Sequence, residues 1–341
     1  MRRRHTDDVS TTVSVIPLRQ VAPDAGTLVG AKALNLAAMM RADLRVPNGF
    51  CVTAEAFRAH VSALLLGTPG RERLAAIREL ISAYELAPET AAGIRAAFAR
   101  LPSPLIAVRS SGTAEDLPGH SFAGLYDTYL RATDAHGCIE LVKRCWASLW
   151  TERAFDYRQK NGFAHDKTAV AVIVQQLVAA DAAGVVFTVD PVSGSRDRIV
   201  VEACWGLGEA LVSGKVTPDR FVIDRKNLRI AERSISTKSV ETAFSPTGSP
   251  VERPVSQARA DKPSISDAAA KELARLALKV ERVYGTPQDI EWALAGSDLF
   301  LLQSRPITTL GKPHCRPLRP SRGRTAKSGP TPTPPKCCPA Y

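Results

Sequence analysis

A polar–apolar alternation near the end of the chain most constrains its fold. Residues 289–294 have the sequence Asp-Ile-Glu-Trp-Ala-Leu, and residues 299–305 have the sequence Leu-Phe-Leu-Leu-Gln-Ser-Arg. Side chains on a β-strand alternate between its two faces. The pattern therefore predicts a hairpin over about residues 288–304, with Asp289 and Glu291 on one face and apolar side chains on the other.

The length of the turn decides which residues of this hairpin meet. With an odd loop, such as residues 296–298, Glu291 lies opposite Gln303 and Asp289 lies opposite Arg305. On the other face, the same register pairs Trp292 with Leu302 and Leu294 with Phe300. An even loop would break both sets, because a slip of one residue exchanges the faces of a strand.

The polar face predicted for this hairpin has two interpretations. Two carboxylates, an amide oxygen and a guanidinium could clamp a Mg²⁺–triphosphate, because Mg²⁺ prefers oxygen ligands and arginine binds phosphate in a bidentate manner. The same face could instead be a solvated sheet surface with cross-strand ion pairs. The hairpin alone favours neither interpretation.

The other patterns indicate an α/β (α+β) fold, in two domains or in one large domain with lobes. Helices are expected over residues 31–40, within 54–100 and over 137–160. Strands are expected over residues 13–18, 51–53, 105–108, 199–202 and 220–224, and a hairpin is expected to pair 169–178 with 185–189. Ser266 and Gly285 are expected to bound a helix, and the Pro/Ser-rich residues 241–262 are expected to form an exposed loop.

The net charge of +11 is concentrated at the C-terminal end. Residues 311–341 hold seven basic and no acidic residues, so the first 310 residues carry +4. A mildly basic body suits a phosphate-binding cleft and does not require nucleic acid as a partner. Eight prolines without apolar periodicity predict a disordered tail over residues 311–341. Residues 1–12 are polar and are expected to be flexible.

The cysteines and the apolar runs bear on the cellular compartment. The cysteines are scattered without the spacing of a metal or redox site. No apolar run reaches the ~18–20 residues that a membrane span requires. Both observations favour a cytoplasmic protein with reduced thiols and no membrane partner.

Four other segments could contact a nucleotide, although each has a simpler explanation. Residues 106–128 join a strand that contains Arg109 to a loop of small and hydroxyl residues, which could cradle phosphate or be a flexible surface loop. Gly30 and Lys32 lie at a helix start, where anions are favoured, although Lys32 could be a surface lysine. Gln175 in an apolar strand could contact a purine or lie at a sheet edge. The last candidate comprises Glu202 and residues 206–209.

Seven motifs occur in order along the chain. They are Gly-Ala-Lys-Ala-Leu-Asn-Leu (30–36), Val-Pro-Asn-Gly-Phe (46–50), Val-Arg-Ser-Ser-Gly-Thr-Ala-Glu-Asp (108–116), Ser-Phe-Ala-Gly (121–124), Gly-Val-Val-Phe-Thr-Val-Asp-Pro (184–191), Gly-Leu-Gly-Glu (206–209) and Asp-Ile-Glu-Trp…Gln-Ser-Arg-Pro (289–306). Together they resemble the N-terminal nucleotide-binding domain of the pyruvate phosphate dikinase and phosphoenolpyruvate synthase group. Residues 206–214 are also similar to rifampicin phosphotransferases. The resemblance covers about residues 15–310.

This resemblance implies an ATP-grasp-like fold that holds ATP between two α/β lobes. The ATP-binding domain would extend over residues 13–310, between the flexible N-terminus and the tail. The resemblance also implies roles for residues that match the motifs. Lys32 and Arg109 would bind phosphates, Arg305 would hold the terminal phosphate, Gly124 and Thr128 would belong to the phosphate-covering loop, and Gln175 would lie near the base. Glu291 and Gln303 would ligate Mg²⁺, with Asp289 close by.

The resemblance further implies a phosphotransferase that cleaves ATP and passes a phosphoryl group to a histidine. None of the six histidines stands in the Thr-Ser-His-type motif of the family, so the acceptor is expected on a separate domain or chain. Phosphoenolpyruvate synthases use that group to convert pyruvate and ATP into phosphoenolpyruvate. The alternatives are a component of a rifampicin phosphotransferase, a truncated nucleotide sensor without catalysis, and, least favoured, nucleic-acid binding through the basic tail.

Overall fold

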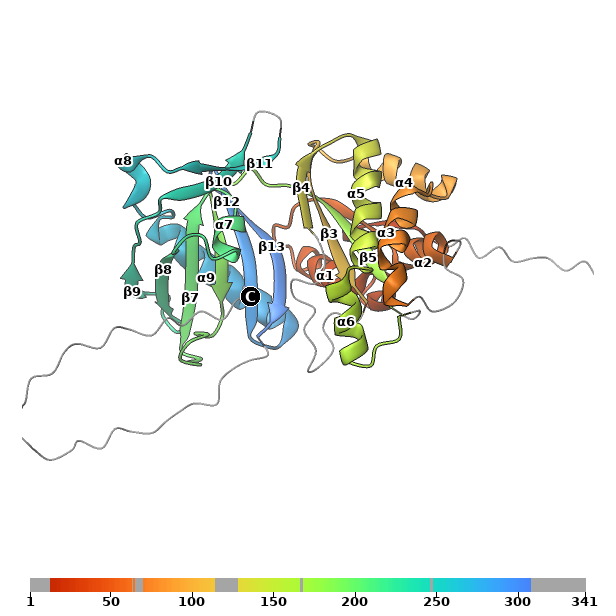
Figure 1. Cartoon of the computed structure of the whole chain (residues 1–341). Coiled ribbons are helices and arrows are strands. Elements are labelled where there is room, and N and C mark those ends of the chain that lie inside the picture. Colours follow the sequence, from red (N-terminus) through yellow and green to blue (C-terminus); the bar gives the residue numbers. More distant parts are fainter. Residues whose placement is uncertain are drawn as a thin grey trace, which may run out of the picture.

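The computed structural model describes residues 13–62, 64, 70–113, 128–165, 168–245 and 248–307. Two lobes lie side by side, each built on an antiparallel sheet with helices against it (Figure 1). The mixed α/β architecture in two lobes confirms the fold class predicted from the sequence. Within the described part of the chain, every helix is too short or too polar to cross a membrane.

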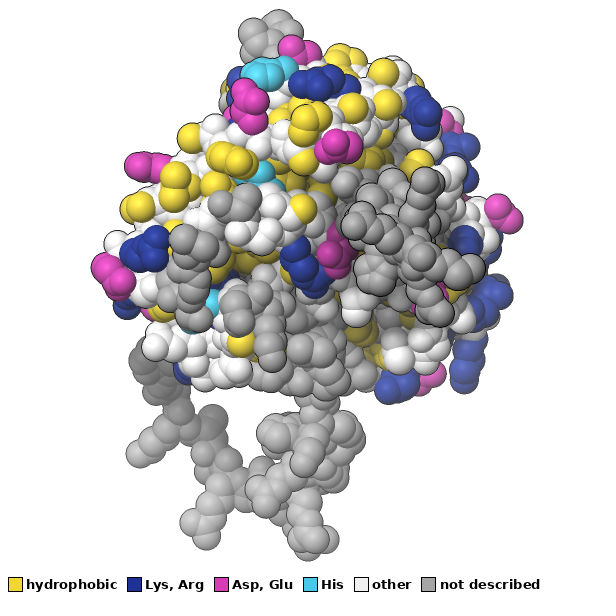
Figure 2. Space-filling model, turned by 90° about the vertical axis from the view of Figure 1, so that its right-hand side faces the viewer, with side chains coloured by type: hydrophobic (Ala, Val, Ile, Leu, Met, Phe, Trp, Pro, Cys, Tyr) yellow, Lys and Arg dark blue, Asp and Glu magenta, His cyan; other side chains and the backbone are white. Residues whose placement is uncertain are grey.

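The N-terminal lobe contains a five-stranded sheet in the order β1-β2-β5-β3-β4. Its strands are β1 (Val15–Pro17), β2 (Gly49–Val52), β3 (Leu105–Gly112), β4 (Thr128–Ala132) and β5 (Val170–Gln176). Its helices are α1 (Gly26–Arg41), α2 (Ala54–Ser62), α3 (Leu74–Ala83), α4 (Pro88–Phe98), α5 (Ala135–Ser148) and α6 (Glu152–Lys160), with short 3-10 turns at Leu18–Gln20 and Arg71–Arg73. Helices α2 to α6 cover the outer side of this sheet (Figure 1), and Figure 2 shows their surface, where hydrophobic, basic and acidic side chains are interspersed.

The C-terminal lobe contains a six-stranded sheet in the order β13-β12-β6-β7-β8-β9. Its strands are β6 (Ala182–Phe187), β7 (Arg198–Trp205), β8 (Asp219–Asp224), β9 (Ile230–Ser234), β12 (Gln288–Ala295) and β13 (Asp298–Pro306). Helix α9 (Asp267–Tyr284) packs on one face, and the short helices α7 (Glu209–Val212) and α8 (Gln257–Ala260) accompany the separate hairpin of β10 (Val240–Phe244) and β11 (Pro250–Pro254). As predicted, Ser266 caps α9 by accepting a hydrogen bond from the Ala269 amide, and Gly285 ends it with φ 70°.

Helix α1 lies between the lobes and contacts β3 and β5 on one side and β13 and α9 on the other. Its buried side chains share one apolar core with β6, β7, β8 and α9. A second core fills the space between the N-terminal sheet and helices α2, α3 and α5, around Trp146 and Trp150. One side of α1 is therefore part of the C-terminal lobe's core, which fixes the position of the N-terminal lobe against it.

Two predictions about local structure are wrong. The strands at 169–178 and 185–189 do not pair with each other, because β5 lies between β2 and β3 in one sheet whereas β6 lies between β12 and β7 in the other. Residues 177–181 therefore connect the lobes. The predicted loop over 241–262 instead contains β10, β11 and α8. Its prolines are compatible with a ladder because Pro250 and Pro254 occupy the two ends of β11.

Candidate functional site

The hairpin of β12 and β13 has an even turn and a β-bulge. Ala295 pairs with Asp298, which leaves the two turn residues Gly296 and Ser297. The register then shifts between Glu291 and Trp292. The shift leaves Leu302 as an unpaired extra residue on β13, which is the geometry of a bulge.

This bulge corrects the predicted register. The polar pairs Glu291–Gln303 and Asp289–Arg305 are confirmed, although the turn has even length. The predicted apolar pairs are wrong: Trp292 pairs with Leu301, and Leu294 pairs with Leu299. The even turn shifts the pairing next to it by one residue from the predicted register, and the bulge cancels this shift. The predicted pairing therefore holds only on the far side of the bulge, where the polar residues lie.

Arg109 joins the two lobes at this bulge. Its Nη1 donates to the carbonyl oxygen of Leu302 over 3.4 Å, and its Nη2 lies 3.0 Å from Glu291 Oε2. Both side chains of the ion pair are mostly buried, with 18% and 29% of their surface exposed. A guanidinium from β3 and a carboxylate from β12 therefore meet at the interface between the two sheets.

Asp289 and Arg305 form the second ion pair of the hairpin. Arg305 Nε and Nη2 lie 2.9 and 2.8 Å from Asp289 Oδ2. Burial raises the pKa of the Asp289 carboxyl, and the charge of Glu291 raises it further, whereas Arg305 opposes both effects. Asp289 Oδ1 is buried and has no hydrogen-bond partner among the described residues. A buried carboxylate oxygen of this kind is suited to a cation.

Lys32 reaches the same region from α1. Helical geometry breaks at Gly30 (φ 72°, ψ 167°) and resumes at once. A side chain at Gly30 would overlap the Ser111 carbonyl, so glycine allows α1 to approach β3 closely. Lys32 Nζ donates to the Ser110 carbonyl oxygen over 3.2 Å, and the Ala33 amide donates to Ser111 Oγ over 3.3 Å. Lys32 is thus held against the residue that follows Arg109.

The remaining predicted residues have different outcomes. Thr128 is exposed at the start of β4 and pairs directly with Arg109 across the ladder, so the two side chains share one face. Gly124 lies outside the described residues. Gln175 is only 2% exposed, and its Nε2 donates to the Pro47 carbonyl oxygen over 3.1 Å. Its amide donor is therefore bonded within the N-terminal lobe, and the nucleotide contact of Gln175 stays a prediction.

The polar face extends further across the sheet than the hairpin. In a single cross-strand row, Gln303 is followed by Glu291, Val185, Glu202 and Arg220. Burial raises the pKa of Glu202; Arg220 opposes this, while the charges of Asp289 and Asp190 raise it again. Sequence reasoning proposed Glu202 but missed Arg220 and Asp190, which form an ion pair of 3.4 Å. The available signal was a charged residue directly before the apolar run of β8, Arg220 ahead of Phe-Val-Ile (221–223).

The same face becomes apolar toward the turn of the hairpin. Val178, Ala183 and Ala293 form a small buried cluster, with Ala180, Ala295, Phe300 and Leu302 packed around it. Ala293 lies two residues from Glu291 and therefore on the same side of β12. One sheet face thus carries charged groups at one end and an apolar surface at the other.

Within the described ranges, three or more His, Cys, Asp or Glu side chains nowhere converge in a way that could hold a metal ion alone. Asp289 and Glu291 with the Gln303 amide oxygen would supply only part of an oxygen shell for Mg²⁺. A cation here would have to share its coordination with oxygens of a bound ligand or with water.

Comparison with known proteins identifies relatives that match most of the chain. The chain is similar to a probable phosphoenolpyruvate synthase of Methanocaldococcus jannaschii, with 40% identity over 306 residues, which cover 84% of this chain and 26% of that protein. It is similar to a rifampicin phosphotransferase of Streptomyces sviceus, with 40% identity over 313 residues, which cover 87% of this chain and 36% of that protein. A prodigiosin synthesizing transferase of Serratia marcescens is 41% identical over 292 residues, which cover 84% of this chain and 32% of that protein.

The chain thus spans between 26% and 36% of the length of these relatives. The family model of the pyruvate phosphate dikinase AMP/ATP-binding domain matches residues 26–318, which include Lys32, Arg109, Asp289, Glu291, Gln303 and Arg305. Because this match extends over most of the chain, the protein belongs to the pyruvate phosphate dikinase AMP/ATP-binding domain family.

Proposed function

We propose that this chain binds ATP with Mg²⁺ between its lobes, cleaves it, and passes a phosphoryl group to a histidine on a separate domain or chain. One observation carries the proposal. Arg109 from the N-terminal lobe contacts Glu291 from the C-terminal lobe. Lys32 bonds the carbonyl of the residue that follows Arg109, and Gln303 pairs with Glu291 across the hairpin. Cations, carboxylates and an amide from both lobes are thus assembled where a nucleotide could be held between them.

The distribution of apolar and charged groups over the site supports a nucleotide. An ATP molecule has an apolar base at one end and a triphosphate at the other. The face of β12 and β13 has the same division, with the apolar cluster near Phe300 and the charged groups near Glu291 and Arg305. The base would lie on the apolar end, and the triphosphate would extend along the charged end toward Lys32 and Arg109.

The residues present also fit Mg²⁺. Glu291, Gln303 and Asp289 would hold the ion. Asp289 Oδ1 is a buried oxygen without a hydrogen-bond partner among the described residues, and a cation would satisfy it. The metal would supply positive charge beside the phosphates. Arg109 and Arg305, which pair with carboxylates in this structure, would bind phosphate oxygens, and Lys32 would add a third positive charge. Positioning and charge stabilisation account for most of the catalysis in phosphoryl transfer.

The final acceptor is proposed from the relatives. Pyruvate is the first candidate, because the similar archaeal protein is named a probable phosphoenolpyruvate synthase. A rifamycin is the second candidate, because the rifampicin phosphotransferase of Streptomyces sviceus has the same identity and covers 87% of this chain. Both candidates place the acceptor outside the ATP-binding face, so they share every residue role given above.

The experiment compares Glu291→Ala with Glu272→Ala in the full chain. Glu272 is an exposed glutamate on α9 that pairs with Arg275, and it serves as the matched control. We expect Glu291→Ala to lose Mg²⁺-dependent ATP consumption by roughly 10²-fold or more in a protein that is still folded. Equal ATP consumption in both variants would reject the assignment of the site. ATP bound by the parent chain without release of ADP or AMP would favour a non-catalytic sensor.

The acceptor is tested by adding a histidine-bearing domain of a relative in trans. Radiolabelled ATP should transfer label to that domain, and label should then pass to pyruvate or to rifampicin according to which substrate is supplied. Failure of label to reach any histidine while ATP is still consumed would reject transfer in trans and leave ATP cleavage intact.

A further inference from the structure

The N-terminal lobe binds the outer backbone edge of β13. Strand β13 stands at the edge of the six-stranded sheet, where backbone groups lack a neighbouring strand. The Leu301 amide donates to the Arg45 carbonyl oxygen over 2.9 Å. The Leu302 carbonyl accepts from Arg109, as described above, and the Ser304 carbonyl accepts from Asn35 Nδ2 over 3.1 Å. Three backbone groups of this edge are therefore satisfied by the other lobe.

Asn35 makes the contact that bears most directly on the site. It lies three residues after Lys32 on α1, so the two side chains project from neighbouring positions of one helix surface. Its partner, the Ser304 carbonyl, lies between Gln303 and Arg305 on β13. One side-chain amide thus connects the helix that carries Lys32 to the strand that carries the metal- and phosphate-facing groups.

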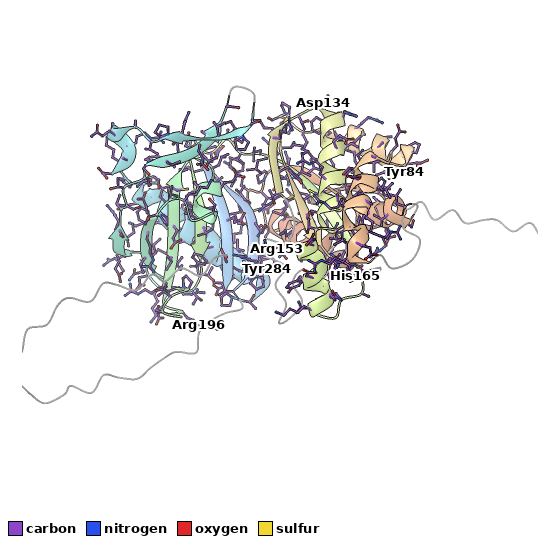
Figure 3. All side chains as sticks on the ribbon, in the orientation of Figure 1. Tyr84, Asp134, Arg153, His165, Arg196 and Tyr284 are labelled. Atoms are coloured by element: carbon purple, nitrogen blue, oxygen red, sulfur yellow. The ribbon has the colours of Figure 1, made fainter. Side chains whose placement is uncertain are left out.

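Other hydrogen bonds hold the two residues that this contact joins. Ser304 Oγ donates to Gln288 Oε1 over 2.6 Å, and Gln288 Nε2 donates to the Thr286 carbonyl oxygen over 3.1 Å. Ser304 and Gln288 are each 2% exposed. On the other side, the hydroxyl of Tyr284, at the end of α9 (Figure 3), donates to the Asn35 carbonyl oxygen over 2.7 Å. Satisfied polar networks in a buried setting favour one arrangement of the groups they join.

We propose that Asn35 is a positioning residue whose side-chain amide, by binding the Ser304 carbonyl, sets the distance of Gln303 and Arg305 from Lys32. This inference rests on the proposed function. It differs from the roles of Lys32 and Arg109, because the Asn35 amide contacts protein backbone and would not contact the nucleotide. A displacement of about 1 Å in a phosphate-binding group is enough to cost about 10²-fold in rate.

The test uses three variants of the full chain. Asn35→Leu removes the amide at similar volume, Asn35→Gln keeps an amide donor on a longer side chain, and Tyr284→Phe removes the hydroxyl that bonds the Asn35 backbone. Tyr284→Phe is the matched control, because it removes one hydrogen bond at the same junction and leaves the Asn35 amide in place. Melting temperature, affinity for a non-hydrolysable ATP analogue with Mg²⁺, and the rate of ATP consumption are measured for each.

We expect Asn35→Leu to lower the rate at saturating ATP by about 10- to 100-fold, with a loss of melting temperature no greater than that of Tyr284→Phe. Tyr284→Phe should stay within about 3-fold of the parent rate, because the amide contact remains. Asn35→Gln should recover part of the rate that Asn35→Leu loses. Should Asn35→Leu fail to fold, Asn35→Ser removes the same amide with a smaller polar side chain.

Equal rates in Asn35→Leu and Tyr284→Phe, or a rate loss that only follows melting temperature, would overturn the positioning role. A parent chain that binds no ATP analogue would instead contradict the proposed function. The two failures are distinct, since the second is visible without any variant.

Discussion

Replacing Gly30 by alanine tests whether the close approach of α1 to β3 is required. Gly30 has φ 72° and ψ 167°, a backbone conformation almost restricted to glycine, which costs a residue with a side chain about 1–3 kcal/mol. An added Cβ would also lie 2.7 Å from the Ser111 carbonyl carbon and overlap its oxygen. Forcing such an overlap in a packed region costs about 1–3 kcal/mol. Gly30→Ala should therefore lower the free energy of unfolding by about 2–6 kcal/mol.

Two other glycines separate these contributions. Gly285 has φ 70°, but no atom lies within 4 Å of an added Cβ, so Gly285→Ala should lose only the conformational part, about 1–2 kcal/mol. Gly26 begins the same helix as Gly30, and its added Cβ would make an ordinary contact of 3.5 Å with Leu34. Gly26→Ala should leave stability unchanged or raise it by up to about 1 kcal/mol.

Urea denaturation followed by tryptophan fluorescence measures the three differences, provided that the m-value is constant. The order of loss should be Gly30→Ala, then Gly285→Ala, then Gly26→Ala. Affinity for the ATP analogue should fall in Gly30→Ala alone, because only that variant moves Lys32 relative to Arg109. A loss in Gly30→Ala no larger than that in Gly285→Ala would refute the reasoning, since α1 could then shift without cost.

Three further predictions concern interactions away from the site. Asp219 and Lys238 form a fully buried ion pair of 2.5 Å. Asp219→Asn should lower the free energy of unfolding by about 3–5 kcal/mol, because Lys238 stays buried without its counter-charge. The double variant Asp219→Asn with Lys238→Met should lose less stability. A larger loss in the double variant, measured by thermal unfolding, would contradict this. Ser266→Ala should cost about 1 kcal/mol by removing the N-cap of α9, and an unchanged urea midpoint would count against the cap. Burial raises the pKa of Glu281, but hydrogen bonds from Arg225 and from Thr188 outweigh the effect of burial and lower the pKa. The ionised Glu281 therefore stabilises the fold at pH values above 4.5, the usual pKa of glutamate, and this contribution is lost as the pH falls. The loss of unfolding free energy in Glu281→Gln should be largest at neutral pH and should shrink in acid. A loss that does not depend on pH would contradict the assignment.

Local chemistry was sufficient to predict the elements whose signals lie within a few residues. Ser266 and Gly285 bound α9 because capping depends on a hydroxyl and on a left-handed residue at the helix ends. The alternation of β12 predicted which side chains face the site, because strand periodicity is a local property. Lys32, Arg109 and Thr128 were predicted through motifs, and the structure places them on adjoining elements of the N-terminal lobe.

Long-range packing decided what those signals could not. The assignment of β5 and β6 to different sheets depends on partners far along the chain, such as β3 and β12, and no residue between 177 and 181 specifies it. Within the Pro/Ser-rich residues 241–262, β11 pairs with β10, and Thr242 of this hairpin also bridges to the distant Gly206. The amide of Gln175, for which a nucleotide contact stays a prediction, donates to the carbonyl of Pro47, which lies far away in the sequence.

The sequence alone determines the polar face of β12 and β13, because the alternation of side chains along a strand depends only on neighbouring residues. Only the tertiary structure decided how that face is aligned: the bulge at Leu302 restores the register of Glu291 and Gln303, and Arg109 and Asn35 bind the outer edge of β13 from the other lobe. The physical reason is that a backbone carbonyl is present at every residue, so the sequence does not show which carbonyls a distant guanidinium or amide will bind.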